Sequence, residues 1–144
     1  MNEAPSGGYI ALVVDDHEAV RRALCDFIAA SFPELEVRAA ASAEEALGIL
    51  DTNRVVLVVM DVELPGMDGI SATRLVHERS PDTAVIVVSV FDDATHRAAA
   101  RRAGARAYVC KRAIGRELVP ALHALLGAPS PVQFPLARRA LPGV

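Results

Sequence analysis

The chain has 144 residues, of which 52% are hydrophobic and 23% are charged, and its formal net charge is −3. This is the size and balance of one globular domain, and no apolar run approaches the roughly 18 residues that a membrane-spanning helix needs. The acidic balance gives no general attraction to nucleic acid, whose binding domains concentrate positive charge. The composition therefore predicts one soluble domain that does not itself bind DNA or RNA.

The N-terminal segment and the cysteines favour a cytoplasmic protein. Residues 1–8 lack the basic start and apolar middle of a secretory signal. Cys25 and Cys110 match no metal or redox spacing, so we expect both to be reduced and to be small buried apolar residues. Of the 15 basic residues only Lys111 is a lysine, so any chemistry that needs an ammonium group must use it.

Five apolar runs, most of them rich in β-branched residues, predict strands. They cover residues 10–14, 35–40, 55–60, 84–88 and 105–109, and the second is the weakest. Between them, apolar residues recur at the spacing of amphipathic helices. Helices are predicted after Asp16, from Ser42, and over residues 69–79, 93–103 and 114–126.

Local signals support two of these helices and complicate a third. Ser42 and Glu45 have the spacing of a capping box, which marks a helix start. Gly104 is placed to close the fourth helix. Pro120 falls inside the fifth, where it removes one backbone hydrogen bond and predicts a kink.

The alternation of five strands with five helices predicts βαβ units and a parallel sheet covered on both faces. We therefore expect an α/β fold, a doubly wound five-stranded parallel sheet of the flavodoxin-like (βα)5 kind, as a single domain over residues 9–127. Residues 1–8 are expected to be an N-terminal extension. Residues 128–144 are rich in proline and are expected to be a tail or linker, too short for a second domain.

Polar, reactive residues follow four of the five predicted strands. Asp15 and Asp16 follow the first strand, Asp61 the third, Ser89 the fourth and Lys111 the fifth. Doubly wound sheets bind ligands outside the carboxyl ends of their strands, so these side chains are expected to meet at one edge. Taken singly, each Asp or Ser could simply begin a turn or cap a helix, but their joint occurrence favours a site.

Three carboxylates at one edge repel one another unless a cation lies between them or one is protonated. Mg²⁺ is the cation that fits, because the group offers oxygen ligands and no His or Cys that would favour zinc. With the ion present, a carboxylate can attack a phosphoryl donor, and an ammonium and a hydroxyl group can stabilise the transferring oxygens. Lys111 and Ser89 can supply these two groups.

At these residues the sequence resembles the receiver domains of bacterial two-component response regulators. The matching motifs are Val-Val-Asp-Asp-His at 13–17, Met-Asp-Val-Glu-Leu-Pro-Gly-Met-Asp-Gly at 60–69, Val-Ser-Val at 88–90 and Ala-Tyr-Val-Cys-Lys at 107–111. The separations between the polar residues of these motifs fit the family as well. The resemblance extends over residues 9–127.

The resemblance implies a role for each residue of the acidic group. Asp61 is expected to accept the phosphoryl group. Asp15, Asp16 and Asp61 are expected to hold Mg²⁺, with the main-chain carbonyl of Glu63 as a further ligand. The phosphoryl donor is expected to be a histidine kinase or a phosphotransfer protein.

The resemblance also implies how the signal leaves the site. Lys111 and Ser89 assist the transfer, and Ser89 with Tyr108 forms the switch pair, in which the hydroxyl moves toward the phosphate and the ring rotates inward. The output face is expected to be the fourth helix, fifth strand and fifth helix, for a downstream protein or a homodimer. Its arginines could meet an acidic partner or simply be solvated: Arg97, Arg101, Arg102, Arg112 and Arg116.

Three positions depart from the usual family pattern. Val90 follows Ser89 where a smaller residue is usual, which would tighten access to the phosphoryl group. Glu63 places an additional carboxylate beside the site, where it could repel a donor or orient water. Arg112 stands where many members have proline, a feature of receivers that precede a helix-turn-helix domain.

Other functions fit the sequence less well. A receiver-like binding module that is not phosphorylated has no need of the full Asp, Ser and Lys set. A phosphohydrolase with an aspartyl nucleophile would have an Asp-x-Asp pattern, whereas this chain has Asp61-Val62-Glu63. No enzyme activity is expected beyond self-catalysed phosphotransfer and dephosphorylation. The chain could be free-standing, a relay intermediate or the N-terminal part of a longer DNA-binding regulator.

Overall fold

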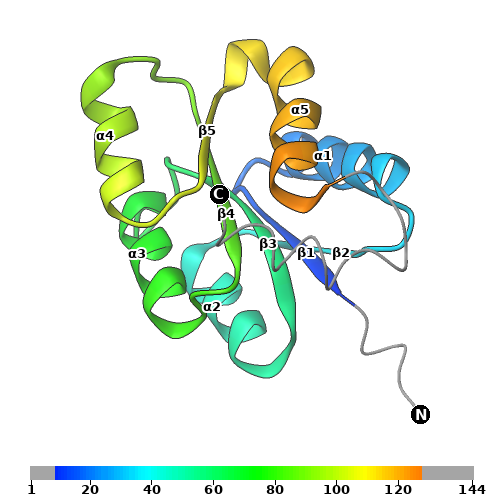
Figure 1. The fold of residues 1–144 in the computed structure, drawn as a ribbon. Coiled ribbons are helices and arrows are strands. Elements are labelled where there is room, and N and C mark those ends of the chain that lie inside the picture. Colours follow the sequence, from blue (N-terminus) through cyan, green and yellow to red (C-terminus); the bar gives the residue numbers. More distant parts are fainter. Residues whose placement is uncertain (1–8, 128–144) are drawn as a thin grey trace.

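The computed structural model of the protein describes residues 9–127. The extension predicted at 1–8 and the tail predicted at 128–144 lie outside the described residues. Strands and helices alternate along the described chain (Figure 1) in the order β1 (Ile10–Val14), α1 (Glu18–Ser31), β2 (Glu36–Ala40), α2 (Ala43–Thr52), β3 (Val55–Asp61), α3 (Gly69–Arg79), β4 (Ala84–Ser89), α4 (Ala94–Arg102), β5 (Ala107–Cys110), a short 3-10 helix η1 (Lys111–Ala113) and α5 (Ile114–Leu126). None of the helices described is long and apolar enough to cross a bilayer.

The strands form one parallel sheet in the order β2-β1-β3-β4-β5. Every residue of β1, β3 and β4 is buried, as expected for strands covered on both faces. In the edge strand β2 only Ala40 is buried, which explains why its apolar run is the weakest in the sequence. The predicted doubly wound α/β fold is confirmed.

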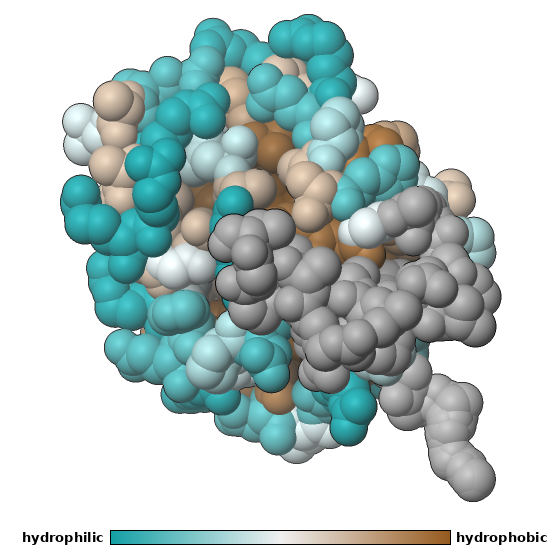
Figure 2. All heavy atoms as spheres, viewed as in Figure 1, coloured by the Kyte–Doolittle hydropathy of each residue, from teal (hydrophilic) through white to brown (hydrophobic). Residues whose placement is uncertain are grey.

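Helices on the two faces of the sheet complete two hydrophobic cores. On one face α1 and α5 contribute Ile28, Leu118 and Leu122, all fully buried. On the other, α2 and α3 contribute Leu47 and Val76. Figure 1 shows α1 and α5 together on one side and α2, α3 and α4 on the other. From the same viewpoint, hydrophobic surface is visible mainly between α4 and α5, with hydrophilic residues along the outer side of α4 (Figure 2).

The helix starts follow the local signals in the sequence. Ser42 accepts a hydrogen bond from the main-chain N–H of Glu45 at 3.1 Å, so this half of the predicted capping box is confirmed. Asp68 and Asp93 cap α3 and α4 in the same way. The helix α5 continues from Ile114 to Leu126 through Pro120.

The fifth strand begins at Ala107, two residues later than the predicted run 105–109. The N–H of Ala105 donates to the carbonyl of Ala100 at 3.0 Å, closing the last turn of α4. Gly104, with a φ of +110°, makes this closure possible. Because the N–H of Ala105 is used by the helix, it cannot join the sheet.

Candidate functional site

The polar residues that follow the strands meet at one edge of the sheet, as predicted. Asp15 follows β1, while Asp61 and Ser89 are the last residues of β3 and β4. All three are buried, whereas Asp16 is exposed. Since β3 lies between β1 and β4 in the sheet, Asp61 occupies the middle of the group.

One carboxylate oxygen from each of Asp15, Asp16 and Asp61 lies within 4.8 Å of the other two. Among the described residues, the buried Oδ2 atom of Asp15 accepts no hydrogen bond and has one ion-pair contact, with the Lys111 ammonium at 3.5 Å. A buried carboxylate oxygen without a donor is costly, and a cation relieves that cost. A set of oxygen ligands with no imidazole or thiolate suits a hard divalent cation such as Mg²⁺, so the residues present fit the predicted ion.

Lys111 brings the opposite charge to the same place. Its Nζ atom lies 3.3 Å from Oδ1 of Asp61 and 3.5 Å from Oδ2 of Asp15. Lys111 directly follows β5 and begins the 3-10 turn, which directs the side chain across the ends of the strands. Burial by itself lowers the pKa of Lys111, but the Asp61 and Asp15 carboxylates outweigh it and raise the pKa above its usual value. Lys111 is therefore charged at neutral pH.

The pKa of Asp61 is raised, first by burial and then by the neighbouring Asp15 carboxylate. The Lys111 ammonium and the N–H of Glu63, which donates to Oδ1 at 3.2 Å, act in the opposite direction but do not restore the usual value. The protein alone thus leaves the ionised form of Asp61 under-stabilised. Additional positive charge at this position would favour that form.

The loop after Asp61 folds back tightly onto the end of β3. The N–H of Gly69 donates to the carbonyl of Val62 at 2.9 Å. A Cβ atom on Gly69 would overlap the main-chain carbonyl oxygen of Asp61, so glycine is required by the close approach. Gly66 has a φ of +73°, which makes the turn. These contacts hold the backbone of Asp61 in one position.

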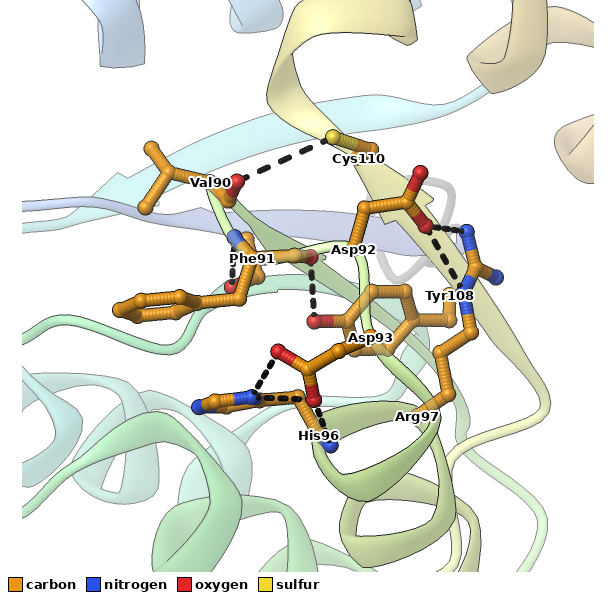
Figure 3. A network of polar contacts seen from close by, with 9 residues as sticks. Val90, Phe91, Asp92, Asp93, His96, Arg97, Tyr108 and Cys110 are labelled. Atoms are coloured by element: carbon orange, nitrogen blue, oxygen red, sulfur yellow. Dashed lines mark hydrogen bonds and ion pairs between the residues drawn. The ribbon is translucent and has the colours of Figure 1, made fainter.

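Ser89 and Tyr108, predicted as the switch pair, are joined through the main chain of Phe91; Figure 3 shows the contact between Phe91 and Tyr108. The N–H of Phe91 donates to Oγ of Ser89 at 3.0 Å. The carbonyl of the same residue accepts a hydrogen bond from the Tyr108 hydroxyl at 2.8 Å. The main chain of Phe91, in the β4–α4 loop, is therefore hydrogen-bonded to both Ser89 and Tyr108.

Side chains of α4 support this loop from below (Figure 3). The His96 ring stacks on the Phe91 ring with centroids 4.3 Å apart and lies 2.8 Å from the Asp93 carboxylate. Arg97 places its guanidinium 4.8 Å from the centre of the Tyr108 ring and donates to Asp92 at 3.0 Å.

Two residues that contact the site, Phe91 and Arg21, were not predicted from the sequence. Phe91 acts through main-chain atoms, which leave no mark on residue type. Arg21 donates from Nη1 to the main-chain carbonyl of Asp15 at 2.8 Å, and its place in the first turns of α1, beside the acidic pair, could have indicated this contact. The predicted ligand role of the Glu63 carbonyl stays a prediction, since the contact described for Glu63 is made by its N–H.

Comparison with known proteins agrees with this geometry. The family model for the response regulator receiver domain matches residues 11–123. An uncharacterized transcriptional regulatory protein of Bacillus subtilis, YhcZ, is 38% identical over 108 residues, which cover 75% of this chain and 50% of that protein. The response regulator UvrY of Escherichia coli is 32% identical over 114 residues, 79% of this chain and 52% of that protein. The chain thus spans about half the length of these curated relatives.

Solved structures of similar proteins have the same fold. A two-component response regulator of the LuxR family from Aurantimonas superposes with a TM-score of 0.74 at 30% identity, covering 91% of this chain and 97% of that one. The response regulator TrrA from Thermotoga maritima, solved in complex with Mg²⁺ and BeF, gives a TM-score of 0.69 at 26% identity, covering 79% and 96%. The chain belongs to the family of response regulator receiver domains, the phosphorylatable signalling domains of two-component systems.

Proposed function

We propose that this receiver domain takes up its phosphoryl group on Asp61, in a site completed by Mg²⁺. The observation that carries the proposal is the convergence of three carboxylates and one ammonium at the edge of the sheet. Asp61 is the central carboxylate and receives both the Lys111 ammonium and the Glu63 N–H. Asp15 and Asp16 are the neighbours that would hold the ion with it.

In the proposed step an oxygen of the Asp61 carboxylate attacks the phosphorus of a phosphohistidine. The new P–O bond forms as the P–N bond breaks, and the leaving imidazole takes up a proton. Lys111 offsets charge on the transferring oxygens, and the Ser89 hydroxyl can donate a hydrogen bond to one of them. When bound, Mg²⁺ supplies the positive charge that the raised pKa of Asp61 indicates is missing.

The proposed partners follow from this chemistry and from the relatives. A histidine kinase or phosphotransfer protein would be the donor, and the cytoplasm is the proposed location. A downstream protein or a second copy would bind through α4, β5 and α5. No enzyme activity is proposed beyond self-catalysed phosphotransfer and dephosphorylation.

A role in transcription is a second proposal, favoured by one specific observation. YhcZ, which is described as a transcriptional regulatory protein, is about twice as long as the segment of it that matches this chain. By analogy, the receiver would control a DNA-binding part outside residues 9–127, and the receiver itself would not contact DNA.

The direct test is intact mass after incubation with Mg²⁺ and acetyl phosphate. The wild-type chain is expected to gain about 80 Da, the mass of one phosphoryl group, and Asp61→Asn is expected to gain nothing. Asp51→Asn, at an exposed aspartate of α2, is the matched control and should behave as the wild type. No gain with any donor, or a gain that persists in Asp61→Asn, would refute the assignment of Asp61.

A further inference from the structure

Asp15 is held by three hydrogen bonds that leave one of its carboxylate oxygens for a cation. Its N–H donates to the carbonyl of Ala40 at 3.1 Å, and its Oδ1 accepts from the N–H of His17 at 2.8 Å. Its carbonyl accepts from Nη1 of Arg21 at 2.8 Å. Among the described residues the remaining polar atom, Oδ2, has the one ion-pair contact with Lys111 at 3.5 Å. The protein thus fixes the other polar atoms of Asp15 and directs Oδ2 to the site.

The hydrogen bond from Arg21 is made at the point where the sheet no longer holds the chain. The strand β1 ends at Val14, the last residue in register with both β2 and β3. The carbonyl of Asp15 lies one residue further, and the Arg21 guanidinium reaches it from α1. Because Asp15 is buried, water cannot readily replace a lost donor at this carbonyl. Arg21 therefore takes over from the sheet in fixing the main chain of Asp15.

Arg21 differs in this respect from Arg22, its neighbour on α1. Arg22 forms an exposed ion pair with Glu18 at 2.7 Å, whereas Arg21 is partly buried and forms no ion pair with another residue of 9–127. Both arginines border a hollow of about 220 Å³ beside α1, so neither side chain is enclosed in a hydrophobic core. Either guanidinium can be removed without opening a cavity in the core, which makes the two residues a matched pair for comparison.

We propose that Arg21 is a positioning residue of the magnesium site, and that it makes the site selective for Mg²⁺ over Ca²⁺. Groups that hold a ligand from behind fix its orientation and tune the affinity for the metal. Mg²⁺ demands near-octahedral geometry at about 2.0–2.1 Å, whereas Ca²⁺ accepts flexible geometry at about 2.3–2.6 Å. A main chain fixed at Asp15 therefore favours the smaller ion. This role rests on the magnesium site proposed above, but not on the identity of the phosphoryl acceptor.

The charge of Arg21 and its hydrogen bond to Asp15 predict opposite effects on the affinity for Mg²⁺. A guanidinium beside the acidic group repels a divalent cation, so its removal would tighten binding if charge alone mattered. Removal of the hydrogen bond would instead free the main chain of Asp15 and weaken binding. Solvent and salt screen the charge of the partly exposed guanidinium, while the bond to the buried carbonyl is not screened in this way. We therefore expect the hydrogen bond to decide the sign.

The test compares the binding of Mg²⁺ and of Ca²⁺ by the wild-type chain and by Arg21→Met, without a phosphoryl donor and at constant ionic strength. Methionine keeps much of the apolar stem and removes both the charge and the donors. Main-chain amide resonances of Asp16 and Val62 follow each titration by NMR. Arg21→Met is expected to bind Mg²⁺ about tenfold more weakly than the wild type, and to lose a smaller factor for Ca²⁺.

Arg22→Met is the matched control, because it removes the same charge one residue away on α1 and keeps the bond to Asp15. Its affinity for Mg²⁺ should not fall. If Arg21→Met does not fold, Arg21→Lys takes its place, with a smaller loss in the same direction because one donor remains.

Three results would overturn the role of Arg21. They are unchanged or tighter Mg²⁺ binding in the Arg21 variant, equal losses in the Arg21 and Arg22 variants, and equal losses for Mg²⁺ and Ca²⁺. The last would indicate a general loosening of the fold. A wild-type chain that binds no Mg²⁺ would overturn the magnesium site itself, together with this role. Since no phosphoryl group is transferred in the test, none of these results depends on whether Asp61 is the acceptor.

Discussion

The Tyr108 hydroxyl donates a 2.8 Å hydrogen bond to the main-chain carbonyl of Phe91. The N–H of Phe91 in turn donates to Ser89 Oγ, so a movement of the Ser89 hydroxyl toward a phosphoryl oxygen would disturb the segment on which Tyr108 is anchored. These two hydrogen bonds physically connect Ser89 and Tyr108, the predicted switch residues. Two arrangements of the β4–α4 loop, one with these bonds and one without, would be the states whose populations phosphorylation shifts.

Tyr108→Phe is expected to favour the second arrangement. The substitution removes the hydroxyl and its hydrogen bond to Phe91 but keeps the ring under Arg97. Loss of one hydrogen bond, about 1 kcal/mol, should tighten the binding of beryllofluoride with Mg²⁺ about fivefold, since this phosphoryl analogue favours the activated state. The affinity can be measured by following main-chain amide resonances during the titration.

Phe91→Leu is a useful companion variant, because it removes the stacking on His96 while keeping the main-chain hydrogen bonds. If Tyr108→Phe binds the analogue no more tightly than the wild type, the hydrogen bond to Phe91 does not hold the unphosphorylated arrangement.

The part of the site that could be predicted from the sequence is the part carried by side chains at strand ends. Buried parallel strands are continuous apolar runs, so the first polar residue after each run, such as Asp15, marks the functional edge. Phe91 could not be found in this way, because its contacts with Ser89 and Tyr108 use main-chain atoms that every residue has. The start of β5 was missed because the N–H of Ala105 is used in closing α4.

A hollow between α4 and β5 that is lined by Arg97, Arg101 and Arg106 was only partly predictable, for a similar reason. Arg97 and Arg101 lie one helical turn apart on α4, which the sequence shows directly. Arg106 reaches the same hollow from the turn before β5, and that approach depends on how α4 packs against the sheet. Charge content alone could not separate these three from the exposed Arg102.

Asp61→Asn is expected to stabilise the fold at neutral pH in the absence of Mg²⁺. The pKa of Asp61 is raised above its usual value by burial and by Asp15. Its favourable contribution to stability is thus fully present below the unfolded pKa and is lost as the pH rises through the folded pKa. Removing the charge should raise the free energy of unfolding at pH 7 by about 1 kcal/mol, or the melting temperature by about 3–5 °C.

The pH dependence and Mg²⁺ distinguish this explanation from a general effect of losing a carboxylate. The advantage of Asp61→Asn should shrink as the pH falls toward 3.8, the usual pKa of the group, and should also shrink when Mg²⁺ is added. Asp51→Asn, at an exposed position, should show neither trend. A lower melting temperature for Asp61→Asn at pH 7 without Mg²⁺ would contradict the raised pKa.

Lys111→Met is expected to destabilise the fold and to do so through Asp61. Methionine keeps much of the apolar stem but removes the ammonium that lies 3.3 Å from Asp61 and 3.5 Å from Asp15. Two buried carboxylates without a cation should cost about 2 kcal/mol at pH 7. In the Asp61→Asn background the cost should be smaller by about 1 kcal/mol, which chemical denaturation of the four proteins measures.

The pKa of Lys111 is itself raised, so its contribution is present below its unfolded pKa and is lost only as the pH rises through the folded value. The cost of Lys111→Met should consequently persist from neutral pH up to about 10. An equal cost in both backgrounds would mean that Lys111 stabilises the fold by packing alone.

Gly69→Ala is expected to be strongly destabilising, because the new Cβ would overlap the carbonyl oxygen of Asp61. That oxygen belongs to the buried backbone of β3 and cannot move aside as a flexible side chain can. We expect a loss of about 3 kcal/mol or more together with slower phosphorylation, since the backbone that carries Asp61 must shift.

Gly48→Ala is the matched control for this substitution. Gly48 lies on the exposed side of α2 with open space where its Cβ would be, so alanine there should gain about 0.5–1 kcal/mol from helix propensity alone. Urea unfolding measures the free energy of unfolding of both variants on one scale, provided that their m-values are equal. If Gly69→Ala unfolds at the same urea concentration as the wild type, the loop after Asp61 is free to move, and it does not hold the acceptor in place.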